Sequence, residues 1–388
     1  MRRGTFVRWG VPIAAAAVIG AAIGAGPVIA AVSGDPVLPQ RSAQQLLADA
    51  VAATEKSEGL PPMSGTVQQT ASLGLPALPQ TGASSPLSLV SGSHEVKVWY
   101  GSQDKLRVAM PTQLNETNLI VNGDQTWYWD SASNTATRVK LQHEGERPHD
   151  LATPRPQDLT PQAVAEKVLS RADEHTAISV TNTAEVAGRP AYQLVLKPKA
   201  AGSLVQEVRL AIDGENYVPL QVQVFAKGSA EPAFQVGFTQ VTFTPPAAEN
   251  FTFTPPAGAK VEEQVIGGEK QKEISKEHAE EARKAAGDIK VVGEGWTSVV
   301  VLPASLSDLT ARPTEGATPS GEKSPFDQGA DPGALVDSVL KSATTVSGPW
   351  GSGKLVKTKL ATALLTDDGR LLVGAVTPEE ITKAAGVR

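Results

Sequence analysis

The chain of 388 residues contains no cysteine. This absence excludes disulfides, thiol catalysis, zinc sites built from cysteine, and the lipid-carrying cysteine of a lipoprotein. The chain also has no excess of positive charge: its formal charge is −6, and removal of residues 1–31 with their three arginines makes it −9. Such an acidic chain is a poor match for nucleic acids or anionic membrane surfaces, so we expect no nucleic-acid partner.

Signatures of enzymes and cofactor sites are scarce as well. The five histidines lie in separate predicted elements without the spacing of metal ligands, and neither a G-x-S-x-G nor an H-E-x-x-H motif occurs. Gly348–Lys354 begins like a phosphate-binding loop, but Leu355 stands where a serine or threonine would hold magnesium. We therefore expect no catalytic residues, metal, cofactor or nucleotide, although residues distant in the sequence could still converge into an active site.

The N-terminal segment has the composition of an export signal. Arg2, Arg3 and Arg8 precede 22 uncharged residues, 11–32, made of Ala, Val, Ile, Gly and Pro. A basic stretch before an apolar one is typical of a secretory signal peptide, and about 20 apolar residues also suffice for a membrane anchor. Both alternatives place the rest of the chain outside the cytoplasm, either secreted or held at the cell membrane by residues 1–32.

Alternating apolar residues predict an antiparallel β-meander over 93–141. Asn122-Gly123 marks a hairpin just before Trp127 and Trp129. A bulge is expected near Gln240, where the alternation of the last strand changes face. Further strands are predicted at 178–182, 185–198 with a turn at Gly188, 205–213, 218–226 and 233–243.

Two helices are predicted beside these strands. Ser42–Gln45 has the pattern of a capping box, and the apolar residues behind it predict an amphipathic helix that ends near Gly59. Pro161 opens a second helix that extends through Ala172.

Residues 71–92 combine many Pro, Gly and Ser residues with five leucines. A solvated linker would carry fewer apolar residues, so the segment is either a loop packed on the sheet or a flap over an apolar cavity. The lid candidates are Leu73, Leu75, Leu78, Leu87 and Leu89.

The C-terminal part contains two segments of biased composition. Residues 263–288 are interpreted as a charged helical spacer, and residues 306–332 as a disordered linker rich in Ser, Pro, Gly and acids. A helix is expected at 334–342 and a hairpin at 354–376. We expect this extension, 289–388, to add its strands to the main sheet or to pack on its helices.

Three motifs carry a resemblance to a known group of proteins: VNGDQTWYWD at 121–130, VAGRPAY at 186–192 and FTFTPPAGA at 251–259. With the order of elements, they make residues 41–262 similar to the LolA/LolB and RseB (MucB) superfamily, and most of all to its actinobacterial branch of outer-membrane-lipoprotein-carrier-like proteins. The resemblance implies an α+β, mainly β fold. Its strongly curved antiparallel sheet, an incomplete barrel, would have helices covering the concave face and an apolar cavity inside.

The carriers of this superfamily take up lipoprotein acyl chains in the cavity, and its RseB-type sensors regulate an anti-sigma factor. The resemblance therefore implies a non-catalytic extracytoplasmic protein that binds a lipid or a lipoprotein acyl chain. The alternative is a sensor that docks a membrane partner such as an anti-sigma factor. Large apolar rings suit acyl chains, although the same residues could be ordinary sheet core. The cavity candidates are Trp99, Trp127, Trp129, Phe234, Val236 and Phe238.

Overall fold

The computed structural model describes residues 37–56, 60–74, 91–141, 174–266, 289–303 and 339–387. These residues form a twelve-stranded and a six-stranded sheet, together with the helices α2 (Ala43–Lys56) and α7 (Pro378–Ala385). No helix among them is both long and apolar enough to cross a membrane. Several predicted segments lie outside the described residues: the signal or anchor 1–32, the second helix 161–172, the linker 306–332, most of the spacer 263–288, and all but the last residues of the helix at 334–342.

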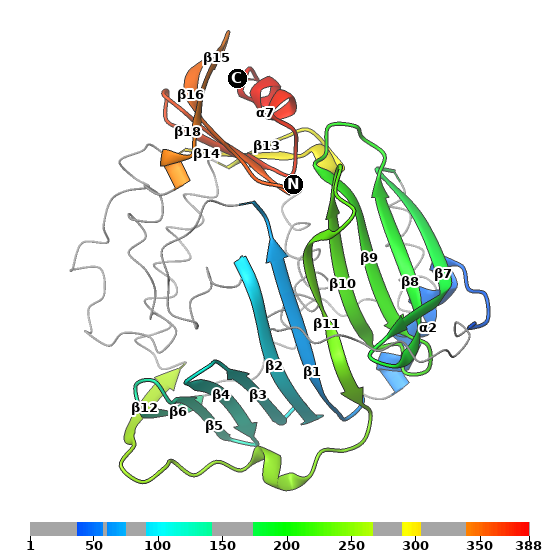
Figure 1. The fold of residues 1–388 in the computed structure, drawn as a ribbon, viewed down its shortest axis with the longest axis vertical. Helices are drawn as coiled ribbons and strands as arrows, with labels where there is room; N and C mark the ends of the chain where they lie inside the picture. The colour runs from blue at the N-terminus through cyan, green and yellow to red at the C-terminus, as the bar shows by residue number, and fades with distance from the viewer. Residues whose placement is uncertain are drawn as a thin grey trace, which may run out of the picture.

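The large sheet is antiparallel except at one edge, where β12 runs parallel to β6. Its order is β12-β6-β5-β4-β3-β2-β1-β11-β10-β9-β8-β7. The sheet curves strongly (Figure 1). It does not close into a barrel, because its edge strands β12 and β7 are not neighbours. The bounds are β1 (Met63–Ser72), β2 (Ser91–Ser102), β3 (Lys105–Pro111), β4 (Glu116–Asn122), β5 (Gln125–Asp130), β6 (Thr135–Leu141), β7 (Thr176–Val186), β8 (Arg189–Pro198), β9 (Val205–Asp213), β10 (Pro219–Ala226), β11 (Pro232–Thr242) and β12 (Lys260–Ile266).

Short-range sequence patterns predicted the position of one hairpin turn and one bulge correctly. The β4–β5 hairpin turns at Asn122-Gly123, as predicted. The predicted bulge is present in β11, where Gln240 and Phe238 pair with successive residues of β1. The predicted gap between strands 178–182 and 185–198 was wrong, because β7 continues through this region with a bulge of its own before it turns into β8.

Helix α2 begins with the predicted capping box. The Ser42 hydroxyl accepts a hydrogen bond from Gln45 N (3.1 Å), and Gln45 Oε1 accepts one from Ser42 N (2.9 Å). The fully buried Leu46 then packs on Tyr192 of β8 and Ile212 of β9. One predicted helix therefore covers one end of the large sheet.

The C-terminal strands form a sheet of their own, which corrects the first of the two expectations for this extension, that its strands add to the main sheet. They pair with one another in the order β13-β14-β18-β17-β16-β15, and Ile381 of α7 packs on one face. Helix α7 was not predicted, although Thr377 caps it and Pro378 stands in its first turn. The bounds are β13 (Lys290–Val292), β14 (Val299–Pro303), β15 (Thr344–Gly348), β16 (Gly351–Lys357), β17 (Thr362–Thr366) and β18 (Arg370–Gly374).

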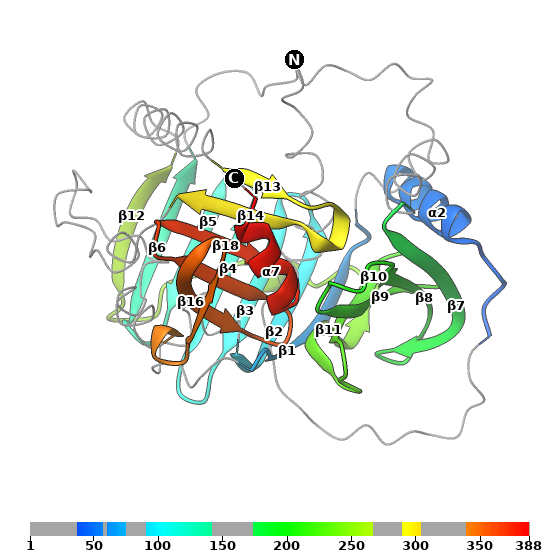
Figure 2. The same cartoon turned by 90° about the horizontal axis from the view of Figure 1, so that it is seen from above.

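The small sheet is attached to strand ends of the large one. Leu204 N, between β8 and β9, donates a hydrogen bond to Ala375 O (2.8 Å). Lys359 N donates to Leu73 O just beyond β1 (2.7 Å), and Trp296 Nε1 donates to the hydroxyl of the first residue of β7 (2.8 Å). These contacts hold the small sheet above β2–β6: seen from above, α7 lies in front of the small sheet and β2–β6 lie behind it (Figure 2).

Candidate binding faces and pocket

Three of the six cavity candidates share one face of the large sheet. Trp99 of β2 pairs with Arg107 of β3. Arg107 pairs with Ile120, which in turn pairs with Trp127 of β5. Because paired residues point to the same side of a sheet and alternate residues share a face, these two tryptophans and Trp129 lie together on what we term the tryptophan face.

The segment 248–258 covers the tryptophan face. It begins with the short 3-10 helix η3 (Ala248–Phe251), which contacts β3 and β4 on their lower side in Figure 1. Phe251 is 3% exposed. The ring centroid of Phe253 lies 5.6 Å from that of Trp127 and 6.0 Å from that of Trp129. These two tryptophans therefore pack against the protein's own chain.

The other three candidates lie on the opposite side, the aliphatic face. Phe238 pairs with Val67 of β1, and Val67 pairs with Val96, an even-numbered residue of β2 on the side opposite Trp99. Val236 and Phe238 are buried in a hydrophobic cluster that includes Val67, and Phe234 is half-buried. The structure thus does not bring the six candidates together.

The aliphatic face continues from this cluster across β2–β5. On β2–β4 it carries two rows of half-buried apolar side chains in register. The periodic spacing had indicated that such residues share a face, but it did not single them out as binding residues. They are Val98, Val108 and Leu119 in one row, and Tyr100, Leu106 and Val121 in the other.

The small sheet presents a second apolar face. One side packs on α7 through a buried cluster that contains Val301, Leu364 and Leu372. In Figures 1 and 2 the opposite side is turned toward β2–β6. Its apolar residues are the buried Leu365 and the half-buried Val300, Leu302, Val356, Ala363, Leu371 and Val373.

Helix α2 covers the aliphatic face at its far end. Leu210 packs with the cluster around Leu46 of α2. It pairs with Val222 of β10, whose partner is Val236 of β11. Of the lid candidates, Leu73 is described and half-buried, whereas Leu75, Leu78, Leu87 and Leu89 lie outside the described residues.

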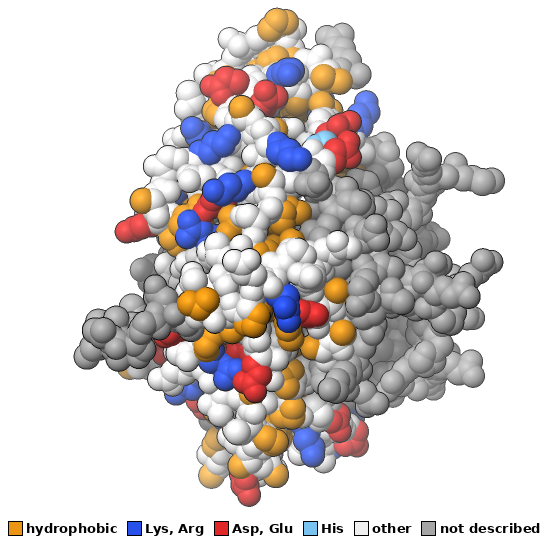
Figure 3. All heavy atoms as spheres, turned by 90° about the vertical axis from the view of Figure 1, so that its right-hand side faces the viewer, with side chains coloured by type: hydrophobic (Ala, Val, Ile, Leu, Met, Phe, Trp, Pro, Cys, Tyr) orange, Lys and Arg blue, Asp and Glu red, His pale blue; other side chains and the backbone are white. Residues whose placement is uncertain are grey.

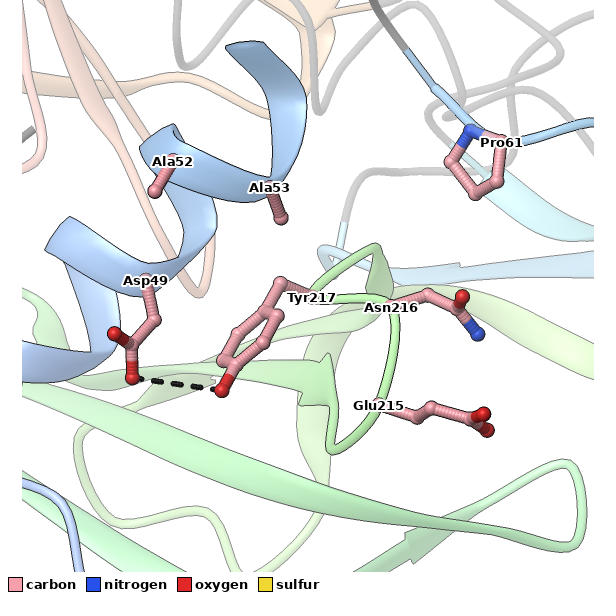
Figure 4. Close-up of a pocket in the computed structure, with 7 residues that line it drawn as sticks. All are labelled: Asp49, Ala52, Ala53, Pro61, Glu215, Asn216 and Tyr217. Carbon is pink, nitrogen blue, oxygen red and sulfur yellow. Dashed lines mark hydrogen bonds between the residues drawn. The ribbon is translucent and has the colours of Figure 1, made fainter. Parts of the chain in front are cut away.

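A separate pocket of about 550 Å³ opens between α2 and the β9–β10 turn (Figure 4). Tyr217 Oη donates a hydrogen bond to Asp49 Oδ2 (3.4 Å), which also accepts one from Arg41 Nε (3.1 Å). Burial and the nearby Asp49 carboxylate raise the pKa of Tyr217, so its phenol keeps its proton. The lining consists of Asp49, Ala52, Ala53, Pro61, Glu215, Asn216 and Tyr217.

The turn that carries Tyr217 is held by the buried carboxylate of Asp213. Asp213 accepts two hydrogen bonds from the Arg189 guanidinium, from Nε and from Nη2, and two from the backbone amides of Glu215 (3.1 Å) and Asn216 (2.7 Å). Burial by itself would raise the pKa of Asp213, but the bonds from Arg189 and the amides outweigh it and hold this pKa below its ordinary value. The turn is therefore preorganised.

Acidic and basic side chains are interspersed on the side of the molecule formed by β7–β11 (Figure 3). Glu207 of β9 illustrates the pattern: its carboxylate lies 3.0 Å from Lys197 Nζ and 2.5 Å from Arg209 Nη2. Because such pairs cancel each other's charge, this side of the molecule has no extended positive potential that would attract a polyanion.

One family model matches part of the chain. Residues 82–262 match the family described as "Predicted periplasmic protein (DUF2092)". This match spans most of the large sheet, including the segment over the tryptophan face. No curated protein matches the chain.

Solved structures give three further similarities. MucB in the MucA/MucB complex of Pseudomonas aeruginosa is 12% identical, over 87% of this chain and 96% of that chain, with a TM-score of 0.40. A LolA superfamily protein from Nitrosomonas europaea is 11% identical over 55% and 99%, with a TM-score of 0.21. A putative outer membrane lipoprotein-sorting protein domain from Vibrio parahaemolyticus is 12% identical over 52% and 94%, with a TM-score of 0.19. The chain is thus similar to solved structures of MucB and of LolA-superfamily proteins, and the actinobacterial part of the resemblance stays a prediction.

Among the described residues, no group of three or more His, Asp or Glu side chains is placed to hold a metal ion. The buried carboxylates of Asp213 and Glu207 are each paired with arginine. Paired in this way, these two carboxylates stabilise the turns and strands around them.

Proposed function

We propose that this protein is an extracytoplasmic, non-catalytic binding protein that holds an acyl chain of a lipid or lipoprotein on the aliphatic face of β2–β5. The observation that supports the proposal is that each sheet has half-buried apolar residues in register on one side. These two sides of the sheets are turned toward each other (Figures 1 and 2). The family description as periplasmic and the basic, then apolar, N-terminal segment support the location.

The free energy of burying hydrocarbon is sufficient to bind a hydrophobic ligand. Each buried methylene stabilises a complex by ~0.8 kcal/mol, so contact with ten methylenes suffices for firm binding without a charged group. Half-buried side chains such as Val108 and Leu119 still have surface to bury.

The test is lipid extraction from the purified protein with mass spectrometry, followed by titration with a fluorescent fatty acid. Leu119→Asp on the aliphatic face should weaken fatty-acid binding by roughly 30-fold, the loss of about two to three methylene contacts. The matched control is Leu114→Asp at the tip of the same β3–β4 hairpin, where the side chain is 92% exposed; it should bind like the unaltered chain. Protein that is always empty and has no affinity for the probe would refute the proposal.

A second candidate is an RseB-like sensor that docks a membrane protein. The outer edge of β15 favours it: this strand ends the order of the small sheet, and its residues other than Val346 are exposed, so a partner strand could pair with it. A photo-crosslinker at Ser347 should capture a membrane protein in an acyl-ligand-dependent manner, whereas one at Ser133 in the β5–β6 turn should not. Equal yields from both positions would count against docking at β15.

A further inference from the structure

The outer edge of β15 is the least protected strand edge in the part of the chain that the structure describes. Four strands end the two sheets: β12, β7, β13 and β15. β12 is lined by charged residues, among them Lys260, Glu262 and Glu263. β7 has a bulge, and its Asn182 carbonyl accepts a hydrogen bond from Leu38 N (3.0 Å), whereas β13 is only three residues long. Such features protect a sheet edge from pairing with another chain.

The strand β15 lacks these features. Its sequence, TTVSG, contains no charge and no proline, its pairing with β16 is regular, and all of its residues except Val346 are exposed. Thr and Val also have a high preference for strands. We propose that β15 pairs antiparallel with β15 of a second copy of this chain, and that the two copies form a symmetric dimer.

The turn between β15 and β16 determines which backbone groups of β15 point outward. Gly348 pairs with Gly351 across a two-residue turn, so these two residues exchange hydrogen bonds with each other. Hydrogen bonds alternate between the two sides of a strand. The amide and carbonyl groups of Thr345 and Ser347 therefore point away from β16, toward the outer edge.

A two-fold axis beside Val346 pairs all of these outward groups. Thr345 of each copy then lies opposite Ser347 of the other copy in a hydrogen-bonded pair, and Val346 lies opposite its counterpart in a non-hydrogen-bonded pair. Cross-strand pairs of Thr and Ser stabilise a sheet. Lys354 of β16 donates to Thr345 Oγ1 (2.7 Å) and lies in the row of Ser352 of the second copy, not in the row of a second lysine. The strand is therefore complementary to itself, which favours a second copy over an unrelated strand.

The position of β15 permits this contact, and its short length makes the dimer weak. In Figure 1 β15 lies at the upper end of the molecule, away from the large sheet, so a second copy can reach its edge. Five residues on each side bury less surface than the roughly 1,200 Å² of a stable interface. We therefore expect a dissociation constant of about 10–100 μM. The dimer uses the edge considered above for a membrane partner, so the two contacts exclude each other.

Single-cysteine variants test the register, because the chain contains no cysteine of its own. In the proposed dimer the Cα atoms of the two Val346 residues lie about 4.5 Å apart, a separation that a disulfide can bridge. Val346→Cys in the full chain should therefore form a disulfide-linked dimer under mild oxidation. The matched control is Thr344→Cys, on the same side of β15 but opposite Gly348 of the second copy. It should crosslink at least about tenfold more slowly.

Sedimentation velocity of the full chain over a concentration series tests the dimer without a crosslink. Ser347→Pro removes an outward amide and should weaken the dimer at least about tenfold, whereas Ser347→Ala keeps the amide and should dimerise like the unaltered chain. Unchanged urea midpoints establish that the variants fold, and if Ser347→Pro does not fold, the cysteine pair decides. The proposal fails if the unaltered chain stays monomeric at ~200 μM, above the expected dissociation constant. It also fails if the two cysteine variants crosslink at equal rates or if folded Ser347→Pro dimerises like the unaltered chain. None of these results bears on the acyl-chain site, which Leu119→Asp probes separately.

Discussion

Asp213→Asn is the substitution whose effect follows most directly from the structure. Asp213 is fully buried, and its carboxylate joins β8 to the β9–β10 turn through Arg189 and two backbone amides. The asparagine side chain has nearly the same shape, so the change removes one buried negative charge and leaves the packing intact.

The loss of unfolding free energy depends on which partners Arg189 keeps after the substitution. Removal of one partner of a buried ion pair costs about 3–5 kcal/mol of unfolding free energy. Arg189 is 25% exposed, keeps Glu215 at 3.0 Å and lies 4.8 Å from the ring centroid of Phe243. We therefore expect a loss of ~2–3 kcal/mol for Asp213→Asn. Glu215→Gln, which removes an 80% exposed partner, should cost less than about 1 kcal/mol.

Urea denaturation followed by tryptophan fluorescence measures both variants, and its pH dependence identifies the charge. The folded-state pKa of Asp213 lies below its unfolded value, so its stabilisation is complete above the unfolded pKa and is lost as pH falls through the folded pKa. The difference between the unaltered chain and Asp213→Asn should therefore be largest near neutral pH and shrink below about pH 4. A loss of unfolding free energy below about 0.5 kcal/mol at neutral pH would refute the reasoning, because at least ~2 kcal/mol is expected. A loss that grows in acid would refute it as well.

Three other predictions follow from single contacts. Leu46→Ala should lower the unfolding free energy by about 2–5 kcal/mol in urea titrations, because it leaves a cavity between α2 and the sheet. Phe253→Ala should shift tryptophan emission to longer wavelength, since it exposes Trp127 to water, and should cost about 1–3 kcal/mol because Phe253 is half-buried; unchanged emission would contradict the packing described for the tryptophan face. Gly202→Val should loosen the small sheet, because a Cβ at this position would lie 2.5 Å from Glu380 Cγ; limited proteolysis should then cut between the sheets faster, and an unchanged rate would argue against this attachment.

Much of the fold could be predicted because its signals are short-range. The capping box at Ser42 and the turn at Asn122-Gly123 depend on residues within one turn of each other, and both were located correctly. The distribution of the six cavity candidates over two opposite faces of the large sheet could not be predicted. Alternation indicates that Trp127 and Trp129 share a face, but not which face Phe253 will cover, since that residue arrives from far along the chain.

The amino-acid sequence by itself determined the alternating strands, their hairpins and the start of α2, because backbone preference and neighbouring side chains decide these features. Only the tertiary structure decided which face of the large sheet stays aliphatic, that the C-terminal strands pair with one another, and that Asp49 meets Tyr217. Each of these depends on contacts between residues far apart in sequence, whose pairing is set by the competition among all surfaces that the folded chain can bury.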